Sequence, residues 1–511
     1  MFPPRHRAVA RAASAATLPA IQRDSDLLQS FLSDAAHVPG GAAEGVVFPR
    51  DVDEVAAVVR AARRVLPVGA QSSLTGGATP RGDVVLSTRG LSEIAEPTGE
   101  TIRVGAGVPL SELQRFLAAR DLYYPPVPTF DGAFVGGTVA TNAAGAATFK
   151  YGVTRDWVSG LTVVLADGSV LDISRDEVRA SDDGVIEVDT GSLGRIRIDI
   201  PTYHVPMLPK VSAGYFTEPH LDLVDLFVGS EGTLGVIAGA TLRIKRRPLR
   251  CVALIACGSE AQAIAVTTSI RAEASTARGP LDVAAIEYMD ARSLALVDES
   301  VFGRAGVGRP TNGTTMLLVQ IETEGHPDAS LARLQDVLQT IGISGDPVIA
   351  LPGDERTAMR LFELREAVPA AVNARVGIAK AHAEDAIQKV AGDFIVPFNA
   401  MATALALYRQ AFERRDLEYA IWGHISDGNL HPNVIPRSLR DVDNGRDALR
   451  EMASGVMALG GAPLAEHGVG RNQLKQQFLR EMYGENGIEQ MRRVKRALDP
   501  EAKFAVGVLF P

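Results

Sequence analysis

Three glycine-rich segments constrain the first half of this chain: PVGAQSSLTGG at residues 67–77, VGGTVATNAAG at 135–145 and VGSEGTLGV at 228–236. Glycine adopts positive φ angles, which turn consecutive backbone N–H groups to one side, and such concave loops bind phosphate. The first loop is not a Walker loop, because no Gly-Lys-Ser/Thr follows, and it lacks the GxGxxG dinucleotide pattern. One such loop alone is more often a plain turn. The three together predict a site for a phosphate-bearing cofactor.

Strands and helices alternate around these loops. A short apolar segment, two aspartates and the helical spacing of Val55, Val58 and Val59 predict a strand, an N-cap and an amphipathic helix within residues 46–65. Further predicted elements are strands at 84–88 and 101–108, a helix at 110–122 and a hairpin at 161–173 with Asp167 and Gly168 in its turn. This alternation predicts an α+β domain.

Composition limits the classes of protein to which the chain can belong. With 511 residues, 46% of them hydrophobic, the chain can bury a large core in two or three domains. Its net charge is -9 and its basic residues are scattered, which argues against a nucleic-acid partner. Cys251 and Cys257 lie in CVALIAC, a predicted buried strand, so a disulfide scaffold or a cysteine-held iron–sulfur cluster is excluded. No apolar run reaches the roughly 18 residues of a transmembrane helix.

The N-terminal segment is rich in arginine, alanine and serine and has no acidic residue before Asp24, a composition typical of a mitochondrial transit peptide. Arginine outnumbers lysine throughout the chain, however, so the same composition also fits an ordinary tail. We expect residues 1–24 to be disordered and the protein to be cytoplasmic, with mitochondrial targeting as the alternative. The basic cluster at 245–247, followed by Pro248, predicts a domain boundary.

The last third of the chain carries a possible metal site. His424 and His431 lie in WGHISDGNLHPN, and Glu466 and His467 lie in AEHGVG. Imidazole suits zinc or iron, and a carboxylate completes a three-ligand set with one open position. The residues between the two histidines favour a strand and a tight turn. On these residues alone, a metal-dependent hydrolase, a redox enzyme and a pair of ordinary structural histidines all stay open.

In this order, the segments resemble the flavin-binding domain of the vanillyl-alcohol oxidase and p-cresol methylhydroxylase (PCMH) superfamily. They are most similar to its D-2-hydroxyacid dehydrogenase branch, which includes D-lactate and D-2-hydroxyglutarate dehydrogenases and the glycolate oxidase subunit. The resemblance covers residues 40–511. It implies a PCMH-type FAD-binding domain of two subdomains over residues 25–247. An α+β cap domain with an antiparallel sheet follows at 248–465, and residues 466–511 return to the flavin and complete the active site.

The resemblance also implies a set of FAD contacts. The expected residues are Pro67, Gly69, Ala70, Gln71, Ser72, Ser73, Thr75, Gly76, Pro128, Thr129, Gly136, Gly137, Thr141, Asn142, Gly145, Tyr151, Gly152, Arg155, Glu231, Gly232, Gly235 and Val236. Two departures stand out. Gln71 and Ser73 replace glycines of the family loop, and the segment KVSAGYF at 210–216 lacks the family's asparagine. The first loop contains no histidine for covalent attachment, so we expect non-covalent FAD.

The family likeness gives the histidine cluster a specific role. GHISDGNLH matches the branch's metal-binding segment, with Ser426 in place of its usual glycine, and it implies His424, His431 and Glu466 as ligands. Zinc is the expected metal, with iron or manganese as alternatives. The implied mechanism has the metal stabilise the developing alkoxide of the substrate while His467 removes the hydroxyl proton and a hydride passes to flavin N5. The alternative role of His467 is to support a metal ligand.

The likeness also implies the substrate and its partners. Arg365 matches the family's substrate-binding arginine, whose planar fork suits a carboxylate, and Lys389 is a weaker match because the spacing to the following DxxxP segment differs. We expect a small D-2-hydroxy acid such as D-lactate or D-2-hydroxyglutarate, oxidised to the 2-oxo acid. The electron acceptor is a quinone, a cytochrome, an electron-transfer flavoprotein or oxygen, and a homodimer is possible. Alternatives are a phenol-oxidising or alkylglycerone-phosphate-synthase-like flavoenzyme, or a non-catalytic flavin-binding protein.

Overall fold

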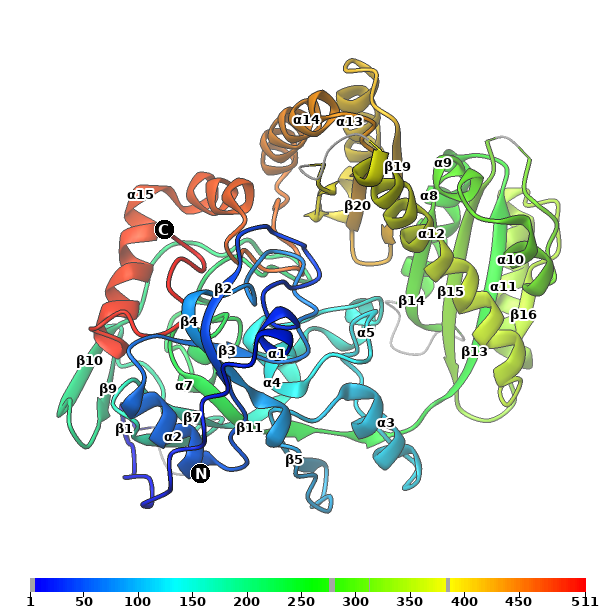
Figure 1. Cartoon of the computed structure of the whole chain (residues 1–511). Helices are drawn as coiled ribbons and strands as arrows, with labels where there is room; N and C mark the ends of the chain where they lie inside the picture. Colours follow the sequence, from blue (N-terminus) through cyan, green and yellow to red (C-terminus); the bar gives the residue numbers. More distant parts are fainter. Residues whose placement is uncertain (1–4, 275–280, 312, 383–386) are drawn as a thin grey trace. The chain divides into compact units, whose positions relative to one another are not determined.

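The computed structural model describes residues 5–274, 281–311, 313–382 and 387–511, which fold into two compact units. Unit 1 comprises the described residues up to Gly145 together with Gly152–Arg247 and Glu466–Pro511. Unit 2 comprises Ala146–Tyr151 and the described residues from Pro248 to Ala465. In Figure 1, unit 1 runs from blue into green and returns in red, whereas most of unit 2 is coloured green to orange. The C-terminal segment therefore belongs to the same unit as the glycine-rich loops.

A three-stranded parallel sheet forms one part of unit 1, in the order β2-β4-β3. Helix α2 (Val52–Ala61) follows β2, and its first turn is capped by Asp51, which accepts the N–H of Glu54 at 2.8 Å. Val58 of this helix and Phe504 of the C-terminal segment share one buried core. The predicted strand, cap and helix are thereby confirmed. The strands are β2 (Ala42–Val47), β3 (Val65–Val68) and β4 (Arg81–Ser87).

A four-stranded antiparallel sheet, in the order β5-β11-β7-β8, forms the second part. The turn of the predicted hairpin joins β7 to β8, where Asp167 accepts the N–H of Ser169 at 2.9 Å and Gly168 has a φ of 80°. The prediction of a hairpin at this position is confirmed. The strands are β5 (Thr101–Gly105), β7 (Val158–Val164), β8 (Val170–Ser174) and β11 (Val236–Arg243).

The N-terminal segment is folded, so the expectation of a disordered tail is wrong for its described residues. Strand β1 pairs in parallel with β9 in a three-stranded sheet of order β1-β9-β10, and Arg7 forms an ion pair with Asp189. Gln22 forms a further bridge to Val46 of the parallel sheet. The exposed edge of β9 supplies backbone partners that composition cannot reveal. The strands are β1 (Arg7–Val9), β9 (Val185–Asp189) and β10 (Arg195–Asp199).

The other elements of unit 1 are short, apart from the C-terminal helix. That helix, α15 (Gln473–Leu498), changes direction at Gly484, whose φ is 66°. Strands β6 and β12 pair with each other in antiparallel orientation. The elements are α1 (Ser25–Gln29), the 3-10 turn η1 (Thr88–Gly90), α3 (Leu110–Ala118), β6 (Leu122–Tyr123), α4 (Val135–Ala140), α6 (Thr154–Trp157), α7 (Leu223–Phe227) and β12 (Lys245–Arg246).

Unit 2 is built on an antiparallel sheet in the order β16-β13-β15-β14-β19-β20-β17, with β18 paired to β20. Cys251 and Cys257 lie in β13 as free, buried thiols, which confirms the predicted buried strand. The strands are β13 (Leu249–Cys257), β14 (Asp282–Met289), β15 (Thr315–Thr323), β16 (Val348–Ala350), β17 (Val390–Ala391), β18 (Phe394–Ile395), β19 (Tyr419–His424) and β20 (Asn429–Val434). The prediction of an α+β cap with an antiparallel sheet is confirmed.

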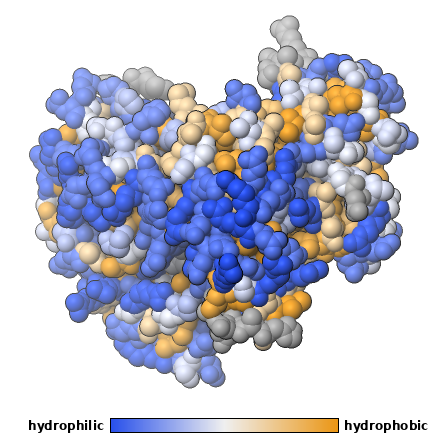
Figure 2. Space-filling model, turned by 90° about the horizontal axis from the view of Figure 1, so that it is seen from above, coloured by the Kyte–Doolittle hydropathy of each residue, from blue (hydrophilic) through white to orange (hydrophobic). Residues whose placement is uncertain are grey.

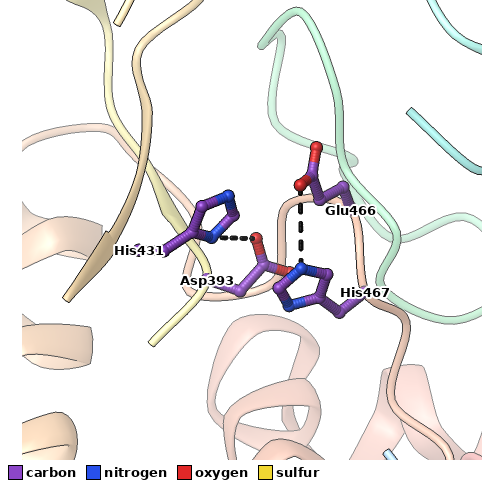
Figure 3. A group of neighbouring side chains, drawn as sticks. All are labelled: Asp393, His431, Glu466 and His467. Atoms are coloured by element: carbon purple, nitrogen blue, oxygen red, sulfur yellow. Dashed lines mark ion pairs between the residues drawn. The ribbon is translucent and has the colours of Figure 1, made fainter. Parts of the chain in front are cut away.

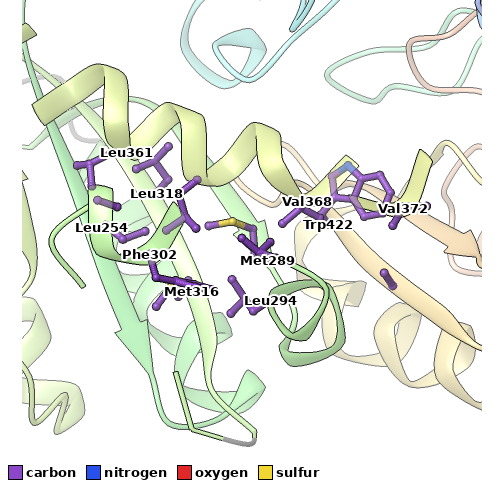
Figure 4. Close-up of a cluster of buried hydrophobic side chains, with 14 of the residues drawn as sticks. Leu254, Met289, Leu294, Phe302, Met316, Leu318, Leu361, Val368, Val372 and Trp422 are labelled. Carbon is purple, nitrogen blue, oxygen red and sulfur yellow. The ribbon is translucent and has the colours of Figure 1, made fainter. Parts of the chain in front are cut away.

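Helix α12 (Glu355–His382) covers one face of this sheet (Figure 4). Leu361, Leu364, Val368 and Val372 recur at helical spacing and are fully buried against the strands in one apolar core. The other helices of unit 2 are α5 (Thr148–Tyr151), α8 (Glu260–Ala274), α9 (Ala291–Ala295), α10 (Glu299–Arg304), α11 (Asp328–Ile341), the 3-10 turn η2 (Phe398–Ala400), α13 (Met401–Glu413) and α14 (Leu439–Ala458). The core therefore fixes α12 firmly on the sheet.

The surface is polar with scattered apolar residues. Figure 2 shows one face, on which hydrophilic residues predominate and apolar residues form small groups. Val9, Phe130 and Met207 are among the exposed large apolar side chains, a normal feature of globular proteins. None of the helices that the structure describes has the length and apolarity needed to cross a membrane.

Candidate functional site

The first glycine-rich loop leaves the carboxyl end of β3, a position at which α/β sheets commonly bind ligands. Among the described residues, the backbone N–H groups of residues 70–74 donate no hydrogen bond, although this stretch is partly buried. Gln71 has a φ of 56° and Gly76 a φ of 74°, so the loop changes hand twice. Consecutive amides without partners in such a loop match the donor set that a pyrophosphate requires. The loop therefore fits a dinucleotide cofactor such as FAD.

Gln71 and Ser73, which stand where the family usually has glycine, are both accommodated in the loop. The Gln71 side chain donates to the carbonyls of Ser30 at 3.0 Å and Ser33 at 2.9 Å, which holds its left-handed backbone in place. The Ser73 hydroxyl accepts the N–H of Thr75 at 3.3 Å and of Gly77 at 3.3 Å. Side-chain hydrogen bonds thus replace the conformational freedom of glycine.

The three glycine-rich segments converge within unit 1. A Cβ atom on Gly69 would lie 3.8 Å from the Cα of Gly137 in α4, and one on Gly232 would lie 3.5 Å from the Pro67 ring. A Cβ atom on Gly137 would meet nothing within 4 Å, so this side of α4 faces open space. Close backbone approach beside open space is the geometry of a cofactor cradle.

Other predicted FAD residues support the cradle. Asn142 accepts the backbone N–H of Arg155 at 2.9 Å, and the Arg155 guanidinium donates to the carbonyl of Val228 at 2.6 Å and pairs with Asp225 at 3.1 Å. These contacts join the second glycine-rich segment to the third. Also in unit 1 are Ala70, Ser72, Pro128, Thr129, Gly136, Thr141, Gly145, Gly152, Gly235 and Val236.

Tyr151, predicted as an FAD contact, lies in a short segment that belongs to unit 2. Residues 146–151, expected within the FAD-binding domain, belong to unit 2, because Lys150 pairs with Asp282 at 2.5 Å and with Glu322 at 2.6 Å. The Tyr151 hydroxyl also donates to Glu322. In this structure Tyr151 therefore anchors its segment to β15 of unit 2.

The loop that carries the predicted base is held by Glu231. Its carboxylate accepts the N–H groups of Val469 and Gly470, both at 2.8 Å, and its backbone has a φ of 52°. Burial raises the pKa of Glu231 to about 7, although these two backbone hydrogen bonds lower it. The sequence predicted Glu231 as an FAD contact, whereas its described contacts are to the AEHGVG loop. His467 lies two residues before Val469, so Glu231 limits where His467 can lie.

Two further cations of unit 1 were missed by the sequence analysis. Arg471 donates to the carbonyl of Thr79 at 2.8 Å and to that of Gly77 at 3.3 Å, which ties the C-terminal segment to the first glycine-rich loop. The fully buried Lys210 ammonium pairs with Glu466 at 2.8 Å. In the sequence, only their positions could have marked them as site residues: Arg471 comes directly after AEHGVG, and Lys210 begins KVSAGYF. A buried lysine is almost always paired, which would have indicated a carboxylate partner.

The predicted metal-binding histidines face each other on one hairpin of unit 2. His424 ends β19 and His431 lies on β20, and their ring centroids are 5.6 Å apart with perpendicular planes. The predicted strand and tight turn between them are confirmed. Gly428 has a φ of 92°, and the Ser426 hydroxyl accepts the N–H of Ile286 at 3.1 Å. Serine at this position thus fastens the turn to β14.

Each of these histidines has a carboxylate on its Nδ1 side. Glu287 Oε1 lies 2.7 Å from Nδ1 of His424, and Asp393 Oδ1 lies 3.7 Å from Nδ1 of His431. Burial raises the pKa of Glu287, but the charge of Arg365 and the hydrogen bonds outweigh it and hold the pKa well below its usual range. A carboxylate hydrogen-bonded to Nδ1, as Glu287 is to His424, orients an imidazole that binds a metal. Asp393 lies beyond hydrogen-bond distance from His431 Nδ1 and acts on it as a nearby charge. The sequence analysis did not predict Glu287 or Asp393 as site residues.

Two buried amide oxygens flank His431 on the same face of β20. Asn429 Oδ1 and Asn433 Oδ1 have no hydrogen-bond partner within the described parts of the chain. Buried polar atoms of this kind mark sites where a ligand, ion or water binds. The residues of this hairpin therefore fit a metal or a polar substrate.

Glu466 and His467 follow directly on unit 2, which ends at Ala465. The Ala465 N–H, at the end of unit 2, donates to the carbonyl of Asp393 at 3.2 Å. Figure 3 draws Asp393, His431, Glu466 and His467, each of which offers a possible ligand atom, and marks two ion pairs. One joins His431 to Asp393, and in the other His467 Nε2 lies 3.6 Å from Glu466 Oε1.

The two predicted substrate residues differ in environment. Arg365 lies on α12 with its side chain 6% exposed, and it donates from Nε to Glu287 and from Nη1 to Glu366, both at 2.9 Å. Lys389 is exposed and donates to Asn373 at 2.9 Å. Arg365 is thus a buried, paired cation, in contrast to the solvated charge that a lone helical arginine would suggest.

Known proteins match nearly the whole chain. Residues 43–174 match the FAD binding domain, and residues 247–508 match the C-terminal domain of FAD linked oxidases. The chain belongs to the FAD-linked oxidase family. It is thus an FAD-binding oxidoreductase, as the family resemblance implied, and the alternative of a metal-dependent hydrolase is set aside.

This FAD-linked oxidase has relatives of three named activities. It is 30% identical to a D-2-hydroxyglutarate dehydrogenase of Xanthomonas citri, over 91% of this chain and 89% of that protein. It is 28% identical to a glycolate oxidase subunit of Bacillus subtilis, over 91% and 89%, and 28% identical to a probable mitochondrial D-lactate dehydrogenase of Danio rerio, over 89% and 82%. A solved alkyldihydroxyacetonephosphate synthase shares its fold, with a TM-score of 0.59 over 90% of this chain and 75% of that one, at 14% identity. The predicted PCMH-type fold is confirmed.

Proposed function

We propose that this FAD-linked oxidase converts a D-2-hydroxy acid to the 2-oxo acid with the help of a divalent cation, with zinc as the first candidate. The observation that carries the proposal is the buried pair His424 and His431, in which Glu287 is hydrogen-bonded to Nδ1 of His424 at 2.7 Å and Asp393 lies 3.7 Å from Nδ1 of His431. Such pairs are typical of metal ligands, and the orphaned amide oxygens beside His431 indicate a polar ligand. The substrate class comes from the relatives, whose names are those of 2-hydroxy acid dehydrogenases and a glycolate oxidase.

The chain supplies three actions toward such a substrate. Arg365 binds the carboxylate of the 2-hydroxy acid through its guanidinium, which Glu287 orients. His424, His431 and Glu466 hold the cation, and Lys210 holds Glu466. His467 removes the proton of the 2-hydroxyl group, and it is suited to this work because imidazole titrates near neutral pH. The bound cation would stabilise negative charge on the hydroxyl oxygen, and bound FAD would take the hydride from C2.

The first glycine-rich loop would hold the cofactor. The amides of residues 70–74 receive the FAD pyrophosphate, and no histidine lies in this loop for a covalent bond to the flavin. The substrate gives up one proton and one hydride, so each turnover yields one 2-oxo acid and one two-electron-reduced cofactor. A separate electron acceptor would be needed to reoxidise bound FAD.

Anaerobic flavin reduction tests this function. The purified protein should be yellow, and D-lactate, D-2-hydroxyglutarate or glycolate should bleach its flavin absorption, whereas the L enantiomers of the chiral acids should not. Removal of metal by a chelator should slow bleaching, and added zinc or manganese should restore it. A protein that cannot be loaded with FAD, or whose flavin no 2-hydroxy acid reduces, would refute the proposal. An equal rate in demonstrably metal-free protein would refute the metal alone.

A further inference from the structure

One buried carboxylate in unit 2 holds two functional side chains at once. Glu287 Oε2 accepts from Nε of Arg365 at 2.9 Å, and Glu287 Oε1 lies 2.7 Å from Nδ1 of His424. The three side chains are 4%, 6% and 1% exposed, so water does not screen these contacts. Each oxygen of the carboxylate thus serves a different part of the proposed site.

The fold fixes this arrangement from both sides. Glu287 on β14 and His424 on β19 are register partners in the antiparallel sheet, so their side chains stand next to each other on one face. Arg365 comes from α12, whose neighbours Leu364 and Val368 are fully buried in the apolar core shared with that sheet. A one-residue shift of either strand would turn one member of the pair to the opposite face.

We infer that Glu287 is a positioning residue that couples the substrate arginine to the metal ligand His424, an inference that rests on the proposed function. A carboxylate can only accept hydrogen bonds, so its contact with Nδ1 requires the proton of a neutral imidazole to be on Nδ1. The lone pair is then on Nε2, which is the nitrogen that can ligate the cation. The other oxygen orients the Arg365 guanidinium toward a carboxylate substrate.

Glutamine at this position tests the coupling because it has nearly the same shape but one acceptor and one donor group. The Arg365 guanidinium always donates, whereas an imidazole nitrogen can donate or accept. In Glu287→Gln the amide oxygen should therefore turn to Arg365 and the amide NH2 to His424. Nδ1 must then accept, the proton moves to Nε2, and His424 can no longer ligate through that atom.

The primary measurement is zinc affinity of the FAD-loaded protein in chelator-buffered dialysis. Glu287→Gln should bind zinc at least about tenfold more weakly than wild type, within the range of about 10- to 100-fold found for residues behind metal ligands. The matched control is Glu366→Gln, because Glu366 also pairs with Arg365 at 2.9 Å but is half-exposed, and among the described residues its hydrogen bond goes to Arg365 and not to His424. Glu366→Gln should keep wild-type zinc affinity.

A second measurement uses the wild-type protein, so it does not depend on whether a Glu287 variant folds. In metal-free wild-type protein labelled with 15N-histidine, His424 should give the nitrogen shifts of the Nδ1–H tautomer, assigned by comparison with His424→Ala. The Nε2–H tautomer, or a Glu287→Gln protein with wild-type zinc affinity, would overturn the inference. Wild-type protein that binds no zinc would instead refute the metal part of the proposed function, so the two failures are distinguishable.

Discussion

The substitution Glu231→Gln tests whether the hydrogen bonds of Glu231 hold the AEHGVG loop, which carries the proposed base His467. The carboxylate of Glu231 accepts two backbone N–H groups, from Val469 and Gly470, each at 2.8 Å. Glutamine keeps the shape of the side chain but has only one oxygen. One of the two N–H groups would then face the NH2 of the new amide and lose its acceptor. The loop that carries His467 would be held by one neutral hydrogen bond instead of two charged ones.

The magnitude follows from the bond that is lost. A hydrogen bond to a charged group contributes roughly 1.5–3 kcal/mol, and a donor left without a partner costs a similar amount. Because about 1.4 kcal/mol corresponds to a factor of ten in rate, flavin reduction should slow by about tenfold to a hundredfold. FAD binding should persist, since the described contacts of the Glu231 carboxylate are to the AEHGVG loop.

The pH profile separates this role from a merely structural one. Burial raises the pKa of Glu231 to about 7, so the carboxylate that accepts both N–H groups is lost as pH falls below about 7. An imidazole base is also lost near about pH 6.5. Two ionisations should make the logarithm of the wild-type reduction rate rise with a slope steeper than one just below about pH 7, over the roughly one to two pH units in which protonation of Glu231 slows the reaction by about tenfold to a hundredfold. In Glu231→Gln only the base titrates, and the slope should fall to one.

The free energy of unfolding should change with pH in the opposite direction to the reduction rate: it should fall as pH rises. A carboxyl group whose pKa is raised from 4.5 to about 7 on folding stabilises the fold fully below pH 4.5, and this contribution is lost as pH rises through about 7. The loss amounts to at most about 3 kcal/mol. Between pH 5 and pH 8 the thermal midpoint of the wild type should therefore fall relative to that of Glu231→Gln.

Stopped-flow reduction by the best 2-hydroxy acid, measured from pH 5 to pH 9, gives both rate and slope. Glu54→Gln is the matched control, because Glu54 is a buried carboxylate of unit 1 that accepts the backbone N–H of Arg50 at 2.8 Å. Its rate and slope should equal those of the wild type. A Glu231→Gln protein with wild-type rate and an unchanged slope would show that the two hydrogen bonds do not position His467.

Two further substitutions test the neighbours of this loop. His467→Ala should keep the yellow colour but slow flavin reduction by about 10²- to 10⁴-fold, the usual contribution of a general base, and an unchanged rate would show that another group removes the proton. Lys210→Met removes the ammonium that pairs with Glu466 at 2.8 Å, so metal-free protein should lose roughly 3–5 kcal/mol of stability. Zinc should raise the thermal midpoint of Lys210→Met more than that of the wild type; an equal rise in both would contradict the role of Lys210 as holder of Glu466.

Local patterns predicted the elements that carry the chemistry. The strand and capped helix within residues 46–65, the hairpin at Asp167 and Gly168, and the hairpin between His424 and His431 all follow from neighbouring residues, and each is present. Turn residues and alternating apolar residues act over a few positions, so a single sequence contains the necessary information. The family likeness added what local patterns lack, namely that the C-terminal segment returns to the first unit.

The residues that position the site could not be found in this way. Glu287 is an acid in the strand DVAAIEYM, whose residues 283–286 are all apolar, and this does indicate a buried, paired charge. Its partners lie 78 and 137 residues away, so nothing near it in the chain identifies them. Strand β1 illustrates the same limit, because its three residues form a strand only when the edge of β9 is available.

The residues that carry the proposed chemistry and the residues that hold them in place therefore lie in different parts of the sequence. His424 is held by Glu287 across 137 residues, Glu466 by Lys210 across 256, and the loop after His467 by Glu231 across 238. In each case a charged side chain that lies outside the histidine hairpin and the AEHGVG loop holds the ligand or loop through hydrogen bonds. A chain that kept the histidine hairpin and the AEHGVG loop but lost these three partners would retain the metal-ligating and proton-accepting atoms. It would lose the tautomer and orientation that make them useful, because the geometry of the site is set by long-range pairs in the fold.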